Sequence, residues 1–177
     1  MALRALALLL SGFLLAGCWQ MKTRPYRDTP GITVFAPGLV TMTGPDKPQH
    51  YRLTRRPNTR YRLTSIDKGA DFGEGFDLGF FPLPGAPSHV LIYQAVPLDH
   101  PRSDDMLRYY GLLVITAPGA AQEVRPDCDK DIAAARISGT RKGSDGACTF
   151  ATRAALEKSL LALWKSGKKP EYSYRLR

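Results

Sequence analysis

The sequence predicts an α+β domain in residues 32–177, with a mostly antiparallel sheet of about five to seven short strands and a C-terminal helix packed on one face of the sheet. Three observations predict this class. Several short segments are rich in β-branched and aromatic residues, and Gly and Pro, 16 and 14 in a chain of 177 residues, separate them. A long helical period occurs only near the C-terminus. The length is typical of one domain.

The first strands are predicted from residue 32 onward. Residues 32–44, ITVFAPGLVTMTG, are interrupted by Pro37 and Gly38, which favours two short strands around a turn. The glycine-rich residues 69–79 lack the spacing of a dinucleotide site, so a loop or hairpin is predicted there. Three later segments are also predicted as strands, of which the last two are nearly continuous in apolar residues and should be central: residues 76–83, 90–96 and 109–116.

The tetrapeptide YRLT occurs twice, at residues 51–54 and 61–64, and predicts a hairpin. Each copy alternates with period 2, so Tyr and Leu share one face of the strand while Arg and Thr share the other. The two apolar sets reach the same face only if the connecting loop holds an odd number of residues. A loop of about three or five residues around a type I turn at Pro57-Asn58 is therefore expected.

The arginines of this hairpin are a candidate anion-binding surface, because guanidinium groups bind phosphate and carboxylate in a bidentate manner. The alternative is a solvated outer face of an edge hairpin, where like charges discourage edge-to-edge pairing. Both interpretations concern the same five residues: Arg52, Arg55, Arg56, Arg60 and Arg62.

The clearest helix is predicted near the C-terminus. Thr149 or Thr152 can cap its start, and Gly167 suits the position just after its end. A core-facing stripe follows the spacing i, i+4, i+7, i+8: Leu156, Leu160, Leu163 and Trp164. A second, shorter helix is expected at residues 131–136. The final residues are predicted as a strand with one shared face: Tyr172, Tyr174 and Leu176.

The first twenty residues form a targeting signal. Arg4 is the only charged residue before Lys22, and the apolar run at residues 5–17 is shorter than the roughly 20 residues that a membrane-spanning helix needs. Leu15-Ala16-Gly17-Cys18 resembles the lipobox of bacterial lipoproteins. The resemblance implies a signal peptide at residues 1–17, cleavage before Cys18, and lipid attached to this cysteine. The alternative is an ordinary signal peptide with a chance cysteine.

The resemblance also implies a membrane partner, reached through the lipid anchor. Residues 18–31 show no helical or strand period, so they are predicted as a lipid-anchored tether. The basic residues of this tether could bind anionic headgroups. The alternative is a linker whose charges have no specific role. Trp19, rather than Asp, follows the cysteine. By resemblance to sorted lipoproteins, this indicates the periplasmic face of the outer membrane in a host with two membranes.

The charge balance and the remaining cysteines agree with an envelope location. The net charge is +9. The anionic partners available to an exported basic protein are phospholipid headgroups and wall polymers, so no nucleic-acid partner is expected. Cys128 and Cys148 are expected to form a disulfide in an oxidising compartment. Their spacing is not C-x-x-C and no histidine cluster lies nearby, so no metal or other cofactor is expected.

The sequence contains no strong catalytic motif, since both G-x-S-x-G and H-E-x-x-H are absent. It therefore favours an envelope lipoprotein with a non-catalytic binding or scaffolding role, whose partner is an envelope protein or an anionic polymer. One alternative is an envelope hydrolase that assembles its site from His89, His100, Asp99 and Asp104. Another is an accessory or inhibitory subunit with an aromatic patch around Tyr109-Tyr110 or Phe80-Phe81.

Overall fold

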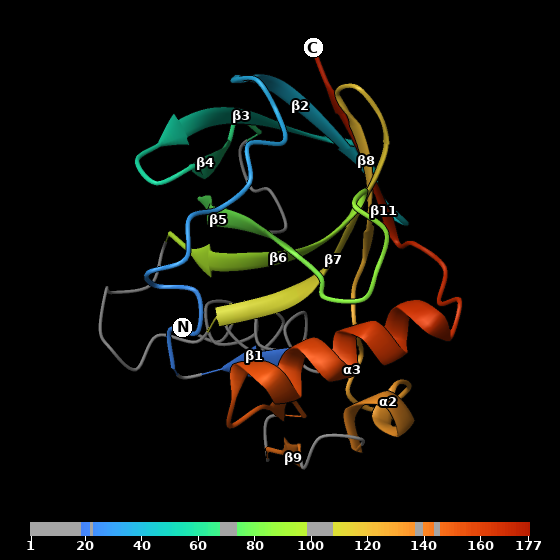
Figure 1. The fold of residues 1–177 in the computed structure, drawn as a ribbon. Coiled ribbons are helices and arrows are strands. Elements are labelled where there is room, and N and C mark those ends of the chain that lie inside the picture. The colour runs from blue at the N-terminus through green and yellow to red at the C-terminus, as the bar shows by residue number, and fades with distance from the viewer. Residues whose placement is uncertain (1–18, 22, 68–73, 99–107, 137–139, 144–145) are drawn as a thin grey trace, which may run out of the picture.

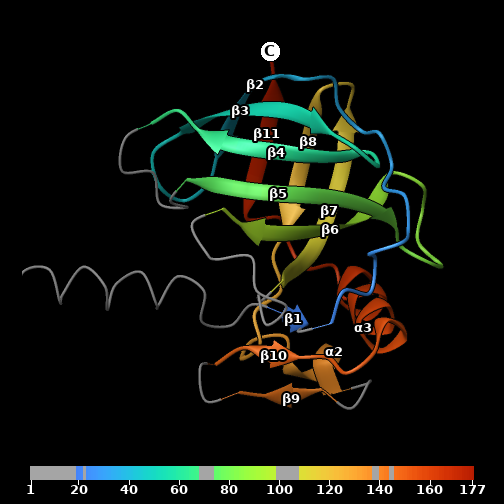
Figure 2. The same ribbon diagram turned by 90° about the vertical axis from the view of Figure 1, so that its left-hand side faces the viewer.

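The computed structural model describes residues 19–21, 23–67, 74–98, 108–136, 140–143 and 146–177. Among these residues, eight antiparallel strands pair in one continuous ring (Figures 1 and 2). Around the ring, each strand pairs with the next along the chain, except that the C-terminal strand inserts between β8 and β2. The strands are β2 (Gly38–Thr43), β3 (Gln49–Arg56), β4 (Arg60–Ser65), β5 (Gly75–Pro82), β6 (Val90–Pro97), β7 (Arg108–Ala117), β8 (Ala120–Val124) and β11 (Tyr172–Leu176).

The predicted α+β class is wrong, because the sheet closes into a barrel instead of forming an open layer with a helix on one face. The pairing of β6 with β7 closes the ring, and β11 joins β8 to β2, which is distant from both in the sequence. Strand β6 pairs with both β5 and β7, and β11 pairs with both β8 and β2, so no barrel strand among the described residues keeps a free edge. Each strand's periodicity is the same in an open sheet and in a barrel, so the sequence pattern could not separate the two.

Three short strands extend the sheet outward from β7: β1 (Trp19–Met21), β10 (Cys148–Thr149) and β9 (Arg141–Lys142). Figure 2 shows them below the barrel, beside α2 (Ile132–Arg136) and α3 (Arg153–Lys165). Strand β1 lies in the segment that was predicted as a tether, and Trp19, Met21 and Tyr26 are fully buried. The described part of that segment is therefore packed against the domain. A strand of three residues is too short to show a period in sequence.

The two faces of the barrel wall bury two separate apolar clusters. Side chains that point into the barrel form the inner core, which includes Val40, Leu53, Leu63 and Leu113. Side chains on the opposite face of β5 to β8 form the outer core with β1, the disulfide and α3. The nearly continuous apolar run of β6 is explained by this arrangement, since alternate residues of one strand enter different cores.

Helix α3 confirms the predicted C-terminal helix. The Thr152 side chain accepts a hydrogen bond from the Ala155 backbone N–H at 3.2 Å, which caps the first turn. Leu156, Leu160 and Leu163 are buried in the outer core, as their spacing predicted. Gly167 adopts φ = 72° just beyond the helix, a conformation that glycine accepts without strain. The shorter helix α2 also lies within its predicted range. No helix in the described ranges is long and apolar enough to cross a bilayer.

The repeated tetrapeptide forms the hairpin β3–β4 with a three-residue loop, as the parity argument required. Leu53 pairs with Leu63 and Arg56 pairs with Arg60. The tight turn centres on Asn58 and Thr59, with φ of 58° and 56°, rather than on Pro57-Asn58 as predicted. Residues 32–44 contain the single strand β2 rather than two strands. Before it, the Ile32 N–H donates to the Phe80 carbonyl at 2.8 Å, so the chain crosses the end of β5.

Candidate functional site

The barrel interior contains a cavity of about 110 Å³ that is partly open to the surface. Its apolar walls come from seven of the eight barrel strands, all except β8, and include Val40, Met42, Leu53, Leu63, Leu113 and Leu176. The size is well above the roughly 10–15 Å³ that accommodates one water molecule, and it is of the same order as engineered apolar cavities that bind benzene. An eight-stranded barrel has an interior that side chains just fill or that holds one small ligand.

Segment 32–37 covers one end of the barrel and contacts the inner core. Tyr61, fully buried on β4, accepts hydrogen bonds from the N–H groups of Val34 and Phe35 at 3.0 and 3.2 Å. Its hydroxyl donates to the Phe35 carbonyl at 3.0 Å. The Phe35 ring meets Phe80 edge-on, with centroids 5.9 Å apart. Together with the Ile32–Phe80 backbone hydrogen bond, these contacts hold the irregular segment in place, because the Tyr61 hydroxyl satisfies the backbone groups of Val34 and Phe35.

A glycine in β7 makes room for a tyrosine inside the cavity. Gly111 pairs with Tyr93 of β6, and both positions point into the barrel. A Cβ atom at Gly111 would lie 2.5 Å from Cε1 of Tyr93, so any larger residue would collide with the ring. The ring therefore crosses β7, and its hydroxyl reaches Glu123 on β8 at 2.7 Å.

Glu123 is the centre of a polar cluster that lines the same cavity. Its side chain is only 5% exposed. Oε1 accepts hydrogen bonds from Tyr93 Oη at 2.7 Å and from Arg125 Nε at 3.0 Å, while Oε2 accepts one from Tyr174 Oη. The Arg125 guanidinium lies 4.4 Å from the Tyr172 ring centroid. We call Tyr93, Glu123, Arg125, Tyr172 and Tyr174 the polar cluster.

The Glu123 charge affects the pKa values of its neighbours in the polar cluster. Burial is the largest single effect on the pKa of Arg125 and lowers it, but the Glu123 carboxylate and the neighbouring tyrosines together raise the pKa above its ordinary value. Burial raises the pKa of Tyr174 well above its ordinary value, and the Glu123 charge adds to the effect. Burial also raises the pKa of Tyr172, although the nearby Arg125 charge opposes this rise. The arginine is therefore charged and the phenols neutral at physiological pH.

The sequence did not reveal this cluster. Tyr172 and Tyr174 were expected to share a face with Leu176, and they do. Glu123 was not singled out, although AAQEV places one carboxylate on the same face as Ala121. Such a carboxylate on the inward face of a strand is the signal that could have found the site. Its tyrosine partners come from β6 and β11, which only the closed barrel brings together.

The five candidate anion-binding arginines lie outside the cavity and divide into two groups. Arg62 forms a bidentate pair with Asp77, at 2.8 and 2.9 Å. Arg60 donates to the Tyr26 carbonyl at 2.5 Å and its guanidinium lies 4.6 Å from the Phe81 ring centroid, while burial lowers its pKa. The remaining three are exposed on β3: Arg52, Arg55 and Arg56.

Of the residues predicted for a hydrolase, the structure describes only His89, and this residue does not line the cavity. His50 Nδ1 lies 3.2 Å from Asp67 Oδ2, but both side chains are exposed. His89 is exposed, and its ring meets Trp164 edge-on, with centroids 6.4 Å apart. His100, Asp99, Asp104 and the predicted lipid attachment residue Cys18 lie outside the described residues. The aromatic residues predicted to form an exposed patch are all buried: Phe80, Phe81, Tyr109 and Tyr110.

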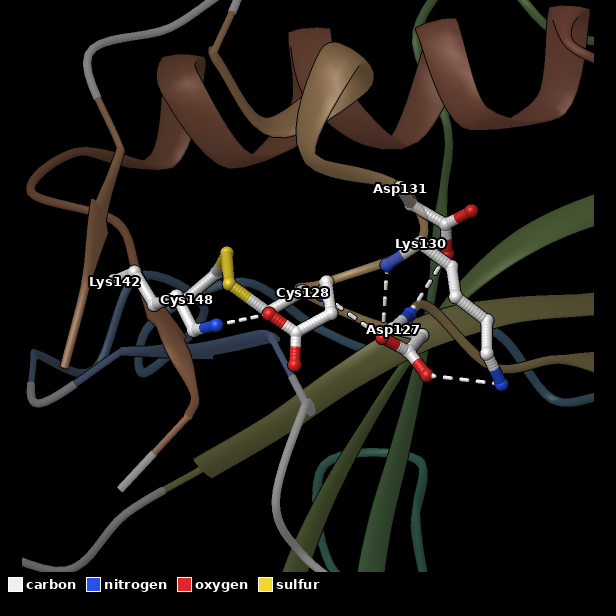
Figure 3. The surroundings of a disulfide bond; sticks show 7 residues. Asp127, Cys128, Lys130, Asp131, Lys142 and Cys148 are labelled. Carbon is white, nitrogen blue, oxygen red and sulfur yellow. Dashed lines mark hydrogen bonds and ion pairs between the residues drawn. A yellow bond between two sulfur atoms is a disulfide. The ribbon is translucent and has the colours of Figure 1, made fainter. Parts of the chain in front are cut away.

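The predicted disulfide between Cys128 and Cys148 is confirmed, with Cα atoms 5.4 Å apart (Figure 3). It joins the chain after β8 to β10. Asp127 and Asp131 stabilise the adjoining turn, because Asp127 accepts from the N–H groups of Asp129 and Lys130, and Asp131 accepts from the Asp127 N–H. Asp131 also pairs with Lys168 at 2.6 Å. No cluster of metal-binding side chains occurs in the part of the chain that the structure describes.

No protein-family model, no curated protein and no solved structure matches this chain. The fold and the cavity therefore carry the functional argument by themselves.

Proposed function

We propose that this protein is a non-catalytic binding protein of the bacterial envelope, anchored by lipid on Cys18, whose barrel holds a small and mainly apolar molecule. The observation that carries the proposal is the hollow inner core. Folded proteins usually pack their interiors to the density of organic crystals. At roughly 24 cal/mol per Å³, leaving the 110 Å³ cavity empty would cost about 3 kcal/mol. A bound ligand would offset that cost.

The position of β1 supports an apolar ligand. The strand begins at Trp19, the residue next to the predicted acylated cysteine, and Trp19 is fully buried. Neighbouring Cα atoms are about 3.8 Å apart, so an acyl chain on Cys18 would hold the barrel directly at the bilayer surface with no spacer. Apolar molecules concentrate at that surface. The proposed anchor would therefore place the cavity where apolar ligands are concentrated.

Fluorescence titration tests the proposal. The mature chain, residues 18–177 with Cys18→Ser so that it remains free of lipid, would be titrated with N-phenyl-1-naphthylamine, an uncharged apolar fluorophore. We expect saturable binding of one probe per chain. Val40→Phe fills the cavity from β2 and should abolish binding, whereas Leu39→Phe makes the same kind of change on the neighbouring exposed residue and should not. Absence of saturable binding to the unsubstituted chain would refute the proposal.

A second candidate role concerns the exposed arginines on β3. Arg52, Arg55 and Arg56 remain exposed after Arg60 and Arg62 are engaged within the domain, so they could contact an anionic envelope polymer or an envelope protein. Replacing these three by Ser should reduce salt-sensitive retention on anionic cell-wall material. Each of the three single Arg→Ser variants has a matched control in Arg62→Ser, which also removes one positive charge, but from an arginine already paired with Asp77.

A further inference from the structure

We infer that the cavity is built for an uncharged amphipathic ligand, with an alkyl portion against the apolar walls and a hydroxyl or amide group at the polar cluster. This inference rests on the proposed function and names the class of ligand. It follows from where the polar cluster lies. Tyr93, Glu123, Arg125 and Tyr174 line the same cavity as Val40, Leu53 and the other apolar walls.

The first argument is charge balance. Glu123 and Arg125 pair at 3.0 Å, and their side chains are 5% and 21% exposed. Their charges cancel inside a wall that excludes most water. A carboxylate or ammonium group on the ligand would have to compete with one partner of the pair and leave a buried charge uncompensated, which is strongly unfavourable. An uncharged group leaves the pair intact.

The second argument is hydrogen-bonding capacity. A carboxylate oxygen accepts two hydrogen bonds, and Glu123 Oε2 receives only that of Tyr174 among the contacts of the described residues, whereas Oε1 receives two. The Tyr174 hydroxyl donates to Glu123, and its oxygen can still accept. A ligand hydroxyl or amide group could donate to Glu123 Oε2 or to Tyr174 Oη, whereas a purely apolar molecule could form neither hydrogen bond.

The geometry around the cluster is also held in place before any ligand arrives. The missing side chain at Gly111 allows the Tyr93 ring to cross β7, and the Arg125 guanidinium stacks on Tyr172. Tyr93 of β6 and Arg125, which directly follows β8, thus approach Glu123 in defined orientations. Preorganised polar groups of this kind give orientation and specificity to an otherwise apolar pocket.

Competition among three eight-carbon probes tests the inference. Octan-1-ol, octanoate and octylammonium share one alkyl chain and differ in the charge of the head group. Each would displace N-phenyl-1-naphthylamine from the mature Cys18→Ser chain at pH 7. We expect octan-1-ol to bind at least tenfold more tightly than either charged probe.

Two substitutions should change this order in opposite directions. In Glu123→Gln the arginine loses its counter-charge, so the affinity for octanoate relative to octan-1-ol should rise at least tenfold. In Arg125→Gln the Glu123 carboxylate loses its counter-charge, so the affinity for octylammonium relative to octan-1-ol should rise by a similar factor. Arg62→Gln is the matched control, because it breaks an ion pair with Asp77 on the outer wall and should leave the order unchanged.

The outcomes separate this inference from the proposed function. Equal binding of the three probes to the unsubstituted chain, or tighter binding of a charged one, would overturn the inference while the binding role stands. Failure of the fluorophore and of all three probes to bind would overturn both. If a substituted chain does not fold, as judged by circular dichroism, the ranking in the unsubstituted chain decides the question.

Discussion

The inner and outer cores of this protein share four strands but are packed differently. In the outer core, Leu156 and Leu160 of α3 are completely buried, as are Ile92 and Leu112 of the barrel wall. The Trp19 and Phe150 rings lie 5.0 Å apart in the same cluster. The inner core surrounds the cavity and includes the polar cluster. The comparison indicates that the outer core supplies stability, while the inner core gives up some packing for a binding site.

Strand β6 shows how one segment contributes to both cores. Val90 and Ile92 point outward beneath the helix and are almost completely buried. Leu91, Tyr93 and Ala95 point inward and line or adjoin the cavity. Because side chains alternate across a strand, substitutions at neighbouring residues test different cores.

Truncation of one leucine in each core should give the largest difference. Leu160→Ala leaves a new cavity in a filled region and should lower the free energy of unfolding by about 4–5 kcal/mol. Leu113→Ala only enlarges an existing cavity and should cost about 2–3 kcal/mol. Urea denaturation followed by circular dichroism measures both. Equal losses would show that the inner core is as tightly packed as the outer one.

Removal of the disulfide should weaken the outer region and spare the cavity. The bond spans 20 residues of chain, so the double substitution Cys128→Ala and Cys148→Ala should cost about 3 kcal/mol. Neither cysteine lines the cavity. Probe binding at a temperature where the variant is folded should therefore match that of the parent chain, and a large loss of affinity there would mean that the two regions are coupled.

Enlargement of one valine in each core should have unequal effects. Val124→Phe overpacks the outer core, where Val124 is 2% exposed, and should cost about 1–3 kcal/mol. Val40→Phe projects into the cavity and should change stability by less than about 1 kcal/mol. Differential scanning calorimetry in the absence of ligand provides the comparison. Strong destabilisation by Val40→Phe would indicate that the cavity has no room for the ring.

Alkaline pH should destabilise both cores through their tyrosines. Burial first, and a neighbouring carboxylate second, raises the pKa of Tyr26 in the outer core and of Tyr174 in the inner core. A raised folded-state pKa means that the neutral phenol's contribution is complete below the unfolded value of about 10 and is lost as pH rises further. Each Tyr→Phe variant should cost about 1 kcal/mol at pH 8 and less at pH 11, as measured by urea midpoints. A cost that is independent of pH would contradict this account.

The smallest effect on folding is expected at the exposed arginines. Replacing Arg52, Arg55 and Arg56 by Ser removes no contact with either core and should change stability by less than about 0.5 kcal/mol. The melting temperature of the triple variant and its affinity for N-phenyl-1-naphthylamine should equal those of the parent. A fall in affinity would mean that these residues influence the barrel cavity.

Local patterns predicted several of the local elements correctly, although the predicted turn position in β3–β4 and the predicted number of strands in residues 32–44 were wrong. The parity of the YRLT repeat required the odd loop of β3–β4, and the spacing of Leu156, Leu160 and Leu163 predicted the buried face of α3. The predicted pairing of Cys128 with Cys148 is also present. The hairpin loop and the helix depend on residues that are close in sequence, so side-chain period specifies them directly, whereas the disulfide was predicted from the cysteine count and the oxidising compartment.

The sequence by itself therefore determined the odd length of the hairpin loop, the capped helix, the disulfide and the apolar character of both faces of β6. Only the tertiary structure decided that the sheet closes, that β1 packs beside β7, and that Tyr93, Glu123 and Tyr174 meet around a cavity. Closure arises from twist and stagger accumulated over eight strands, and no single strand records that sum in its own side-chain pattern.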